Sequence, residues 1–178
     1  MRSVHNFITI IGLLSASSFA TPLQARGESH TITFANKCGK GTPTLVQSGK
    51  ILSTGQPFTS SGPFEAGIAY LQTGECGLNG DKCTTLEMTL KTPPTPGAGS
   101  STDVTLIPPH AFNVGVGFKY SNGCDGQGQS CEAANCHSAF RTPTDYFAQT
   151  QCEEANRLKR PLGFHRSISS LLSASSSV

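Results

Sequence analysis

Strict alternation of apolar and polar residues in short segments is the feature that most constrains how this 178-residue chain folds. The clearest case spans residues 112–120, where every second residue is apolar: Phe112, Val114, Val116, Phe118 and Tyr120. Alternation with a period of two and one polar face predicts a half-buried strand of an antiparallel sheet. A chain built from such segments must pair them and cover their apolar faces.

Four further segments predict strands, namely residues 30–36, 64–71, 84–90 and 102–107. In 84–90 the polar positions include Glu87, and in 102–107 they include Asp103. Gly-rich turns separate the segments, and no stretch of ten or more residues predicts a helix. Charged residues make up only 13% of the chain, which argues against a coiled coil. The expected fold class is all-β, an antiparallel β-sandwich in which two sheets bury these faces against each other.

The N-terminus predicts a secretory signal peptide over residues 1–20. A basic start is followed by the apolar run 7–14 and by small residues that favour cleavage after Ala20. The alternative is a membrane anchor, but the run is shorter than the ~20 residues that a spanning helix needs. We therefore expect a secreted, extracellular protein without a membrane span, and a flexible segment over residues 21–29.

Charge is unevenly distributed. Residues 27–156 contain seven Lys and Arg against eleven Asp and Glu, whereas four basic residues fall within 157–178. The body of the protein is therefore acidic. It has no basic stripe with interleaved aromatic residues, so we expect no nucleic-acid partner.

Seven cysteines complete the framework: Cys38, Cys76, Cys83, Cys124, Cys131, Cys136 and Cys152. In a secreted chain they predict disulfides. The alternative is a zinc half-site formed by Cys131, Cys136 and His137. No second pair with metal-ligand spacing completes it, so no metal and no other cofactor is expected.

Six short motifs occur in one order along the chain: Asn36-Lys-Cys38, Thr85-Leu-Glu-Met88, Asp103-Val-Thr105, Phe112-Asn-Val114, Gly123-Cys124 and Cys131-Glu-Ala-Ala-Asn-Cys136. In this the chain resembles the thaumatin-like family, in particular its small fungal members. The resemblance spans residues 30–156 and implies a single thaumatin-like (osmotin-like) β-sandwich domain. The large disulfide-rich second domain of the plant members is missing.

The resemblance also implies the disulfides Cys76–Cys83, Cys124–Cys152 and Cys131–Cys136. It leaves Cys38 outside these pairs, because the family's partner cysteine in a final strand is not found here. An odd cysteine in a secreted protein carries a thiol or bridges two molecules, so a Cys38-linked dimer is one expectation.

Residues 157–178 depart from the family pattern. They are basic and then Ser-rich, and we expect a disordered tail, either genuine or produced by a shifted reading frame or a misplaced splice boundary. A sheet edge would then lie open beside Cys38. The loop 92–102 is expected to be flexible, and its Ser, Thr and Pro content allows O-glycosylation.

An acidic cleft that binds β-1,3-glucan is what the resemblance implies about function. Glu87 and Asp103 match its acidic positions, and both fall on predicted polar strand faces. The family's cleft also contains an Arg, for which Lys82 is only a loose counterpart in this sequence. For a further acidic position of that cleft, the candidates are Glu153 and Glu154. An incomplete set favours sugar binding over hydrolysis, so neither carboxylate is assigned a catalytic role.

We therefore expect a secreted protein that binds cell-wall polysaccharide through Glu87 and Asp103, in wall remodelling or defence. The alternatives are a weak endo-β-1,3-glucanase that uses the same two residues, and a non-catalytic secreted interaction or antifungal protein. His110 and His137 are interpreted as loop residues. For four aromatic residues, the sequence leaves open whether they are core residues, rim residues or platforms for sugar rings: Tyr70, Tyr120, Tyr146 and Phe147.

Overall fold

The computed structural model describes residues 27–154, 162–165 and 174–177, and it arranges them mainly as strands. Within these ranges the helical structure is limited to one 3-10 turn, η1 (Tyr146–Ala148). No helix in the same ranges is long and apolar enough to cross a membrane. The all-β class is thus confirmed, while the predicted signal peptide at 1–20 and the segment 21–26 lie outside the described residues.

The strands form two seven-stranded sheets. The first sheet contains β1 (Ser29–Ile32), β2 (Phe34–Asn36), β5 (Phe58–Ser61), β9 (Gly115–Ser121), β10 (Gly128–Cys131), β13 (Leu162–His165) and β14 (Ala174–Ser177). The second contains β3 (Thr42–Gln47), β4 (Lys50–Ser53), β6 (Phe64–Gln72), β7 (Thr85–Leu90), β8 (Ser100–Thr105), β11 (Ala139–Phe140) and β12 (Gln149–Cys152). The order in the second sheet is β11-β8-β7-β6-β3-β4, with β12 also paired to β8.

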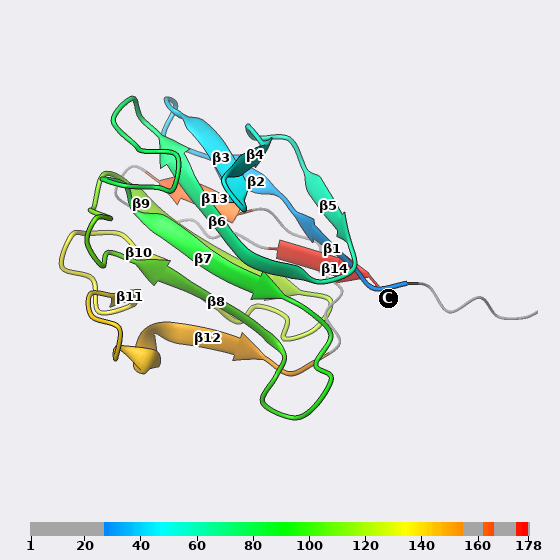
Figure 1. The fold of residues 1–178 in the computed structure, drawn as a ribbon. Helices are drawn as coiled ribbons and strands as arrows, with labels where there is room; N and C mark the ends of the chain where they lie inside the picture. The colour runs from blue at the N-terminus through cyan, green and yellow to red at the C-terminus, as the bar shows by residue number, and fades with distance from the viewer. Residues whose placement is uncertain (1–26, 155–161, 166–173, 178) are drawn as a thin grey trace, which may run out of the picture.

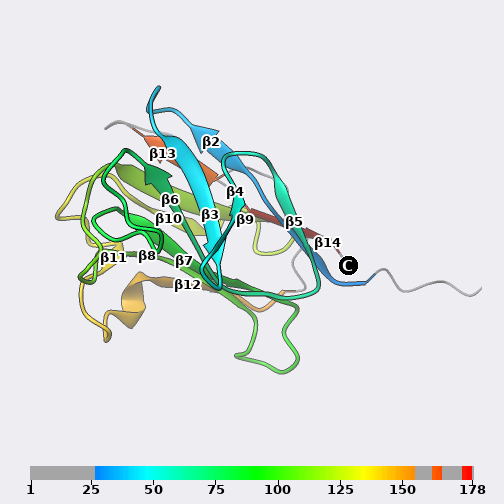
Figure 2. The same cartoon turned by 45° about the horizontal axis from the view of Figure 1, so that its top comes forward.

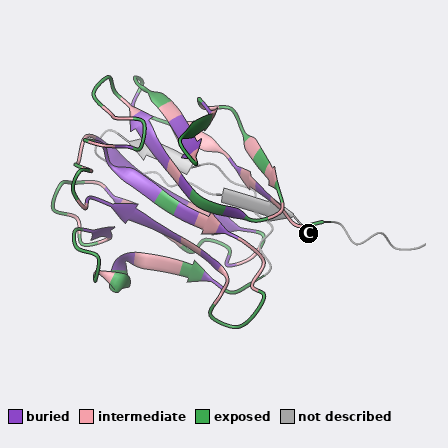
Figure 3. Cartoon of the chain, viewed as in Figure 1, coloured by how far each residue is buried: buried purple, intermediate pink, exposed green. Residues whose placement is uncertain are grey.

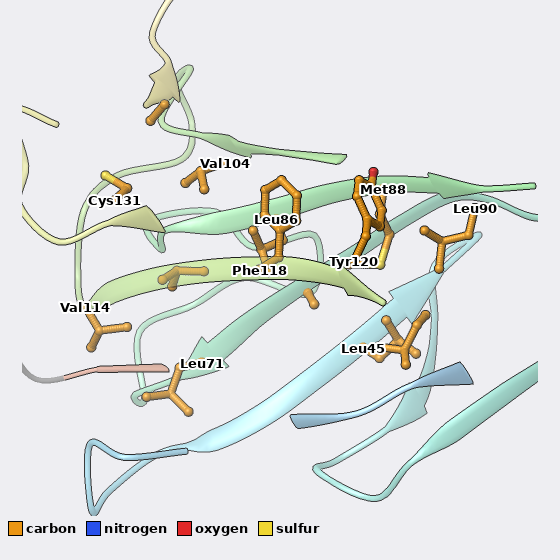
Figure 4. Packing of buried hydrophobic residues seen from close by; sticks show 14 of the residues in the cluster. Leu45, Leu71, Leu86, Met88, Leu90, Val104, Val114, Phe118, Tyr120 and Cys131 are labelled. Atoms are coloured by element: carbon orange, nitrogen blue, oxygen red, sulfur yellow. The ribbon is translucent and has the colours of Figure 1, made fainter. Parts of the chain in front are cut away.

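The two sheets lie face to face, with β6, β7 and β8 in front of β9 in both views (Figure 1 and Figure 2). Side chains from both sheets form one core cluster, including Leu86 and Met88 from the second sheet and Phe118 and Tyr120 from the first (Figure 4). The central strands of the second sheet are buried along most of their length (Figure 3). Each fully buried side chain of this size stabilises the fold by about 1.5–3 kcal/mol relative to exposure.

Pairing is mostly antiparallel, but three pairs are parallel: β2 with β13, β9 with β14, and β8 with β11. The expectation of a purely antiparallel sandwich is therefore corrected to antiparallel-rich sheets. The parallel pairs arise where a strand arrives by a long connection rather than by a hairpin.

The sequence alternation is matched in β7 but not in β8 or β9, where residues of both faces are buried, and the strand predicted over 112–120 begins only at Gly115. In β7, Leu86, Met88 and Leu90 are buried in the core, and Glu87 between them is exposed. The predicted strand at 30–36 is divided at Thr33, because β1 pairs with β5 whereas β2 pairs with β13. β1 already begins at Ser29, within the segment expected to be flexible.

The expectation of a disordered tail over 157–178 is wrong for two of its segments. Strand β13 lies between β2 and β9, and β14 lies between β1 and β9. Backbone N–H and C=O groups on one side of β2 are thereby paired, and β2, the strand before Cys38, is the last strand in the order of this sheet. Every Ser residue supplies one backbone donor and one acceptor, so the Ser-rich β14 can form a ladder. Residues 155–161, 166–173 and 178 lie outside the described residues.

Three disulfides join Cys76 to Cys83, Cys124 to Cys152 and Cys131 to Cys136, the pairs that the family resemblance implies. The bond between Cys131 and Cys136 consumes both sulfurs of the alternative zinc half-site, which is thereby excluded. Cys38 is buried in the core, 8% exposed, and takes no part in these bridges. A Cys38-linked dimer would require this thiol to become accessible, and it stays a prediction.

Candidate functional site

The two carboxylates singled out by the sequence lie side by side on the second sheet. Glu87 of β7 and Asp103 of β8 are directly opposite each other in the antiparallel register. Residues in that relation project to the same face, with Cβ atoms about 4.5–5.5 Å apart. This is the outer face of the sheet, because their chain neighbours Leu86 and Val104 belong to the core. The expectation that the two side chains face one groove therefore agrees with the register.

The carboxylates belong to a row that crosses the sheet. Successive register pairs connect Val46 of β3 to Ile68 of β6, Ile68 to Glu87, Glu87 to Asp103, and Asp103 to Gln149 of β12. The row is apolar on the β3 side and polar on the β12 side. Val46 is 1% exposed, so a ligand that lay along the row would meet Ile68 first and the two carboxylates next.

A hollow of about 310 Å³ opens over this row. Six of its lining residues define what we call the acidic hollow: Ala66, Ile68, Glu87, Thr89, Ser101 and Asp103. An adjoining hollow of about 370 Å³ shares Ala66, Ile68 and Glu87 and extends to Asn79 and His110. Glu87 thus stands where the two hollows meet.

A β-bulge in β6 shapes the acidic hollow. The register between β6 and β7 shifts between Phe64 and Gly67, and Ala66 within the bulge has a φ of 52°. At the bulge, the small side chain of Ala66 stands where regular pairing with β7 would otherwise continue. Ala66 and Thr89 both line the hollow at this point. Bulges commonly redirect side chains next to binding sites in this way.

Electrostatics distinguish the two acids. Asp103 is 8% exposed, and burial, with a further contribution from the charge of Glu87, raises its pKa to about 7. Glu87 is exposed. Neither carboxylate belongs to an ion pair among the described residues. Near neutral pH, therefore, the Asp103 carboxyl group retains its proton part of the time.

The other sequence-predicted acids are used elsewhere. The Glu153 carboxylate accepts hydrogen bonds from the backbone N–H groups of Gly97 (2.9 Å) and Gly99 (3.3 Å). It therefore tethers the loop that we expected to be flexible. Glu154 accepts a hydrogen bond from the N–H of Cys124 at 2.8 Å. Both contacts are structural, and neither residue lines the acidic hollow.

Lys82 lies outside both hollows, whereas His110 shares the adjoining hollow with Glu87. Lys82 is exposed, and its backbone N–H donates to the carbonyl of Pro109 at 2.8 Å. It does not line either hollow. His110, interpreted as a turn residue, lines the adjoining hollow, with its Nδ1 3.0 Å from the Gly80 carbonyl oxygen.

The structure divides the four aromatic candidates into two pairs. Tyr70 and Tyr120 are 1% exposed, and their hydroxyl groups donate to Leu78 and Thr102, so both are core residues. Tyr146 and Phe147 are 70% and 66% exposed. Phe147 lines a third hollow with His137, which the sequence gave no means of placing.

Comparison with known proteins finds no match to this chain among protein-family models, curated proteins or solved structures. The fold and the site themselves define an all-β, disulfide-bonded domain with an acidic hollow on one sheet.

Proposed function

We propose that this chain is a secreted, small thaumatin-like protein that binds cell-wall polysaccharide through the acidic hollow. The first candidate for this polysaccharide is β-1,3-glucan. The observation that carries the proposal is the register pairing of Glu87 with Asp103 on the floor of that hollow. The motif order described above supports the family assignment. Three disulfides support an extracellular setting, because such bonds persist in oxidising compartments.

The chemistry of the pair suits a neutral sugar. The carboxylate oxygens of Glu87 accept hydrogen bonds from sugar hydroxyl groups, whereas a protonated Asp103 can also donate one. Ile68, the half-buried apolar residue of the row that lines the hollow, offers a surface for the C–H face of a pyranose ring. An anionic polymer would be repelled by the two acids, so the proposed ligand class is an uncharged polysaccharide.

Binding is favoured over hydrolysis because the set of charged groups is incomplete: Lys82, Glu153 and Glu154 do not line the acidic hollow. Hydrolysis requires two carboxyl groups that flank the scissile bond, one of which protonates the leaving oxygen. A weak endo-β-1,3-glucanase stays the alternative, because Glu87 and Asp103 are neighbouring carboxyl groups and a pKa of about 7 suits Asp103 to act as a general acid.

Co-sedimentation with insoluble β-1,3-glucan tests the proposal. We expect wild-type protein to pellet with the glucan and Glu87→Gln/Asp103→Asn to remain in the supernatant. The matched control is Glu75→Gln/Asp125→Asn, which removes the same charge from exposed residues outside the hollow. Equal binding by both double variants would contradict the assignment of the ligand to the acidic hollow.

Two further readouts separate the alternatives. Release of new reducing ends from soluble glucan by wild type, but not by Glu87→Gln/Asp103→Asn, would establish the glucanase. Absence of binding to both glucan and chitin by folded wild-type protein would overturn the polysaccharide proposal. The non-catalytic interaction protein would then be the better description.

A further inference from the structure

The third hollow is built at the edge of the second sheet, next to the strand that carries Asp103. It has a volume of about 370 Å³, and its lining includes Asn135, His137, Arg141, Thr142, Asp145 and Phe147. Strand β11, which forms one wall through Ala139, pairs with Val104 of β8. Strand β8 therefore lines the acidic hollow and is paired with a strand that lines this one. We call it the Phe147 hollow.

The walls of the Phe147 hollow are held in place before any ligand arrives. The Cys131–Cys136 disulfide closes one loop, and the Arg141 guanidinium donates to the carbonyl oxygens of Ala134 and Cys136 in that loop. The Asp145 carboxylate accepts from the backbone N–H groups of Arg141 and Thr142, both at 2.9 Å. A surface that is already ordered loses less conformational entropy on binding.

Phe147 presents an exposed aromatic ring to the hollow. Its ring is 66% exposed, and the His137 ring lies beside it, with centroids 6.1 Å apart. The polar groups around it are an amide, a guanidinium and a carboxylate whose charges balance. A flat aromatic face surrounded by neutral hydrogen-bonding capacity matches a pyranose ring, with one apolar face and a rim of hydroxyl groups.

We infer that the Phe147 hollow is a second sugar-binding subsite, which a single polysaccharide chain occupies together with the acidic hollow. The inference rests on the proposed function. β8 lines the acidic hollow and pairs with β11, which lines the Phe147 hollow, so a polymer that spans the two can engage the second site without a second encounter, which raises its overall affinity. The substrate class that this geometry selects is a long, uncharged polysaccharide rather than a short oligosaccharide.

The test measures binding of insoluble β-1,3-glucan, and of soluble β-1,3-gluco-oligosaccharides of increasing length, by single variants. Phe147→Ala should weaken binding to the insoluble glucan about tenfold, as expected for loss of one aromatic stacking contact. Phe147→Trp should restore it, since a larger flat face remains, whereas Phe147→Leu should not. For wild type, affinity should rise with oligosaccharide length, and this rise should be lost in Phe147→Ala.

Tyr146→Ala is the matched control, because Tyr146 is 70% exposed in the same turn but does not line the hollow. It should bind as wild type does. Both side chains are largely exposed, so neither substitution should change the melting temperature appreciably.

The outcomes separate the two proposals. If Phe147→Ala and Tyr146→Ala both bind normally while Glu87→Gln/Asp103→Asn does not, the second subsite is refuted and the acidic hollow stands. Equal losses in Phe147→Ala and Tyr146→Ala would refute the hollow as the specific site. Loss in Phe147→Ala alone, with normal binding by the double variant, would refute the acidic hollow and leave the Phe147 hollow. Absence of any binding by wild type would overturn both.

Discussion

At the residue scale, Asp103 is a carboxylic acid that the fold holds largely out of water. Its pKa is raised from 3.8 to about 7, first by burial and second by the charge of Glu87. Ionisation of such a buried carboxyl group lowers the stability of the folded protein. A destabilising group that is kept in a hollow is typical of binding and catalytic sites.

The raised pKa predicts a specific dependence of stability on pH. Between about pH 4 and pH 7 the unfolded chain releases the Asp103 proton that the folded chain keeps, so the contribution of Asp103 to the free energy of unfolding falls as pH rises. Asp103→Asn should abolish this contribution. Relative to wild type, the variant should gain on the order of a few kcal/mol between pH 4 and pH 8. Urea denaturation of both proteins across this range measures the difference, and parallel curves would contradict the prediction.

Glu87→Gln tests separately how much the charge of Glu87 contributes to the raised pKa of Asp103. It should lower the pKa of Asp103 part of the way towards its ordinary value, because burial, the larger cause, remains. Titration of the Asp103 carboxyl carbon by NMR gives the midpoint. Glu75→Gln, in an exposed loop, should leave that midpoint unchanged.

How far the sequence predicts this site is clear from Asp103. The alternation of apolar and polar residues places Glu87 and Asp103 on polar strand faces, and the structure agrees. Alternation cannot supply the register that sets the two residues opposite each other, because register depends on the connection between β7 and β8 and on tertiary packing. Alternation also predicts that Asp103 is exposed. The residue is buried because β12 pairs with the far side of β8, where Gln149 lies directly opposite.

At the element scale, the bulge in β6 depends on Gly67. A Cβ atom at this position would lie 2.0 Å from the ring of Phe64, which is 1% exposed and fills the core beneath the bulge. The backbone of Gly67 is not in the left-handed region, so the requirement for glycine here is one of space rather than of φ. The shape of the acidic hollow thus depends on a residue that projects to the other face of the sheet.

Gly67→Ala should therefore destabilise the fold by about 1–3 kcal/mol, as overpacking of a core commonly does. Chemical denaturation provides the measurement. Gly27→Ala is the control, since nothing lies within 4 Å of the added Cβ, and it should be neutral. Phe64→Leu combined with Gly67→Ala should recover part of the loss. If Gly67→Ala alone matched wild type, the steric account of the bulge would be wrong.

β6 and β7 match the predicted segments 64–71 and 84–90 to within one residue at each end, whereas the longest alternation, 112–120, forms a strand only from Gly115. The hairpin of β3 and β4 was not predicted, although Ser48 and Gly49 form a two-residue loop with φ values of 49° and 72°. A Ser-Gly pair between short apolar runs is the signal that could have found it. Strand β14 offers no such signal, because its position is set by the neighbouring strands rather than by its own side chains.

At the scale of the whole molecule, the three disulfides differ in what they join. Cys124–Cys152 links the turn after β9, in the first sheet, to the end of β12, in the second, across 28 residues of chain. The other two close local loops, with sequence separations of 7 and 5. In the chain-entropy model, a longer closed loop restricts the unfolded state more.

Removal of each bridge by paired Cys→Ala substitutions should follow that order. Loss of Cys124–Cys152 should cost about 3.5 kcal/mol, and loss of Cys131–Cys136 about 2 kcal/mol, with Cys76–Cys83 slightly above the latter. Each pair includes at least one cysteine that is no more than 1% exposed, so the cavities left by alanine are similar and largely cancel in the comparison. Denaturation of the three variants measures the order. If Cys124→Ala/Cys152→Ala lost no more stability than Cys131→Ala/Cys136→Ala, the two sheets would be held together by the shared core alone, without a contribution from the bridge between them.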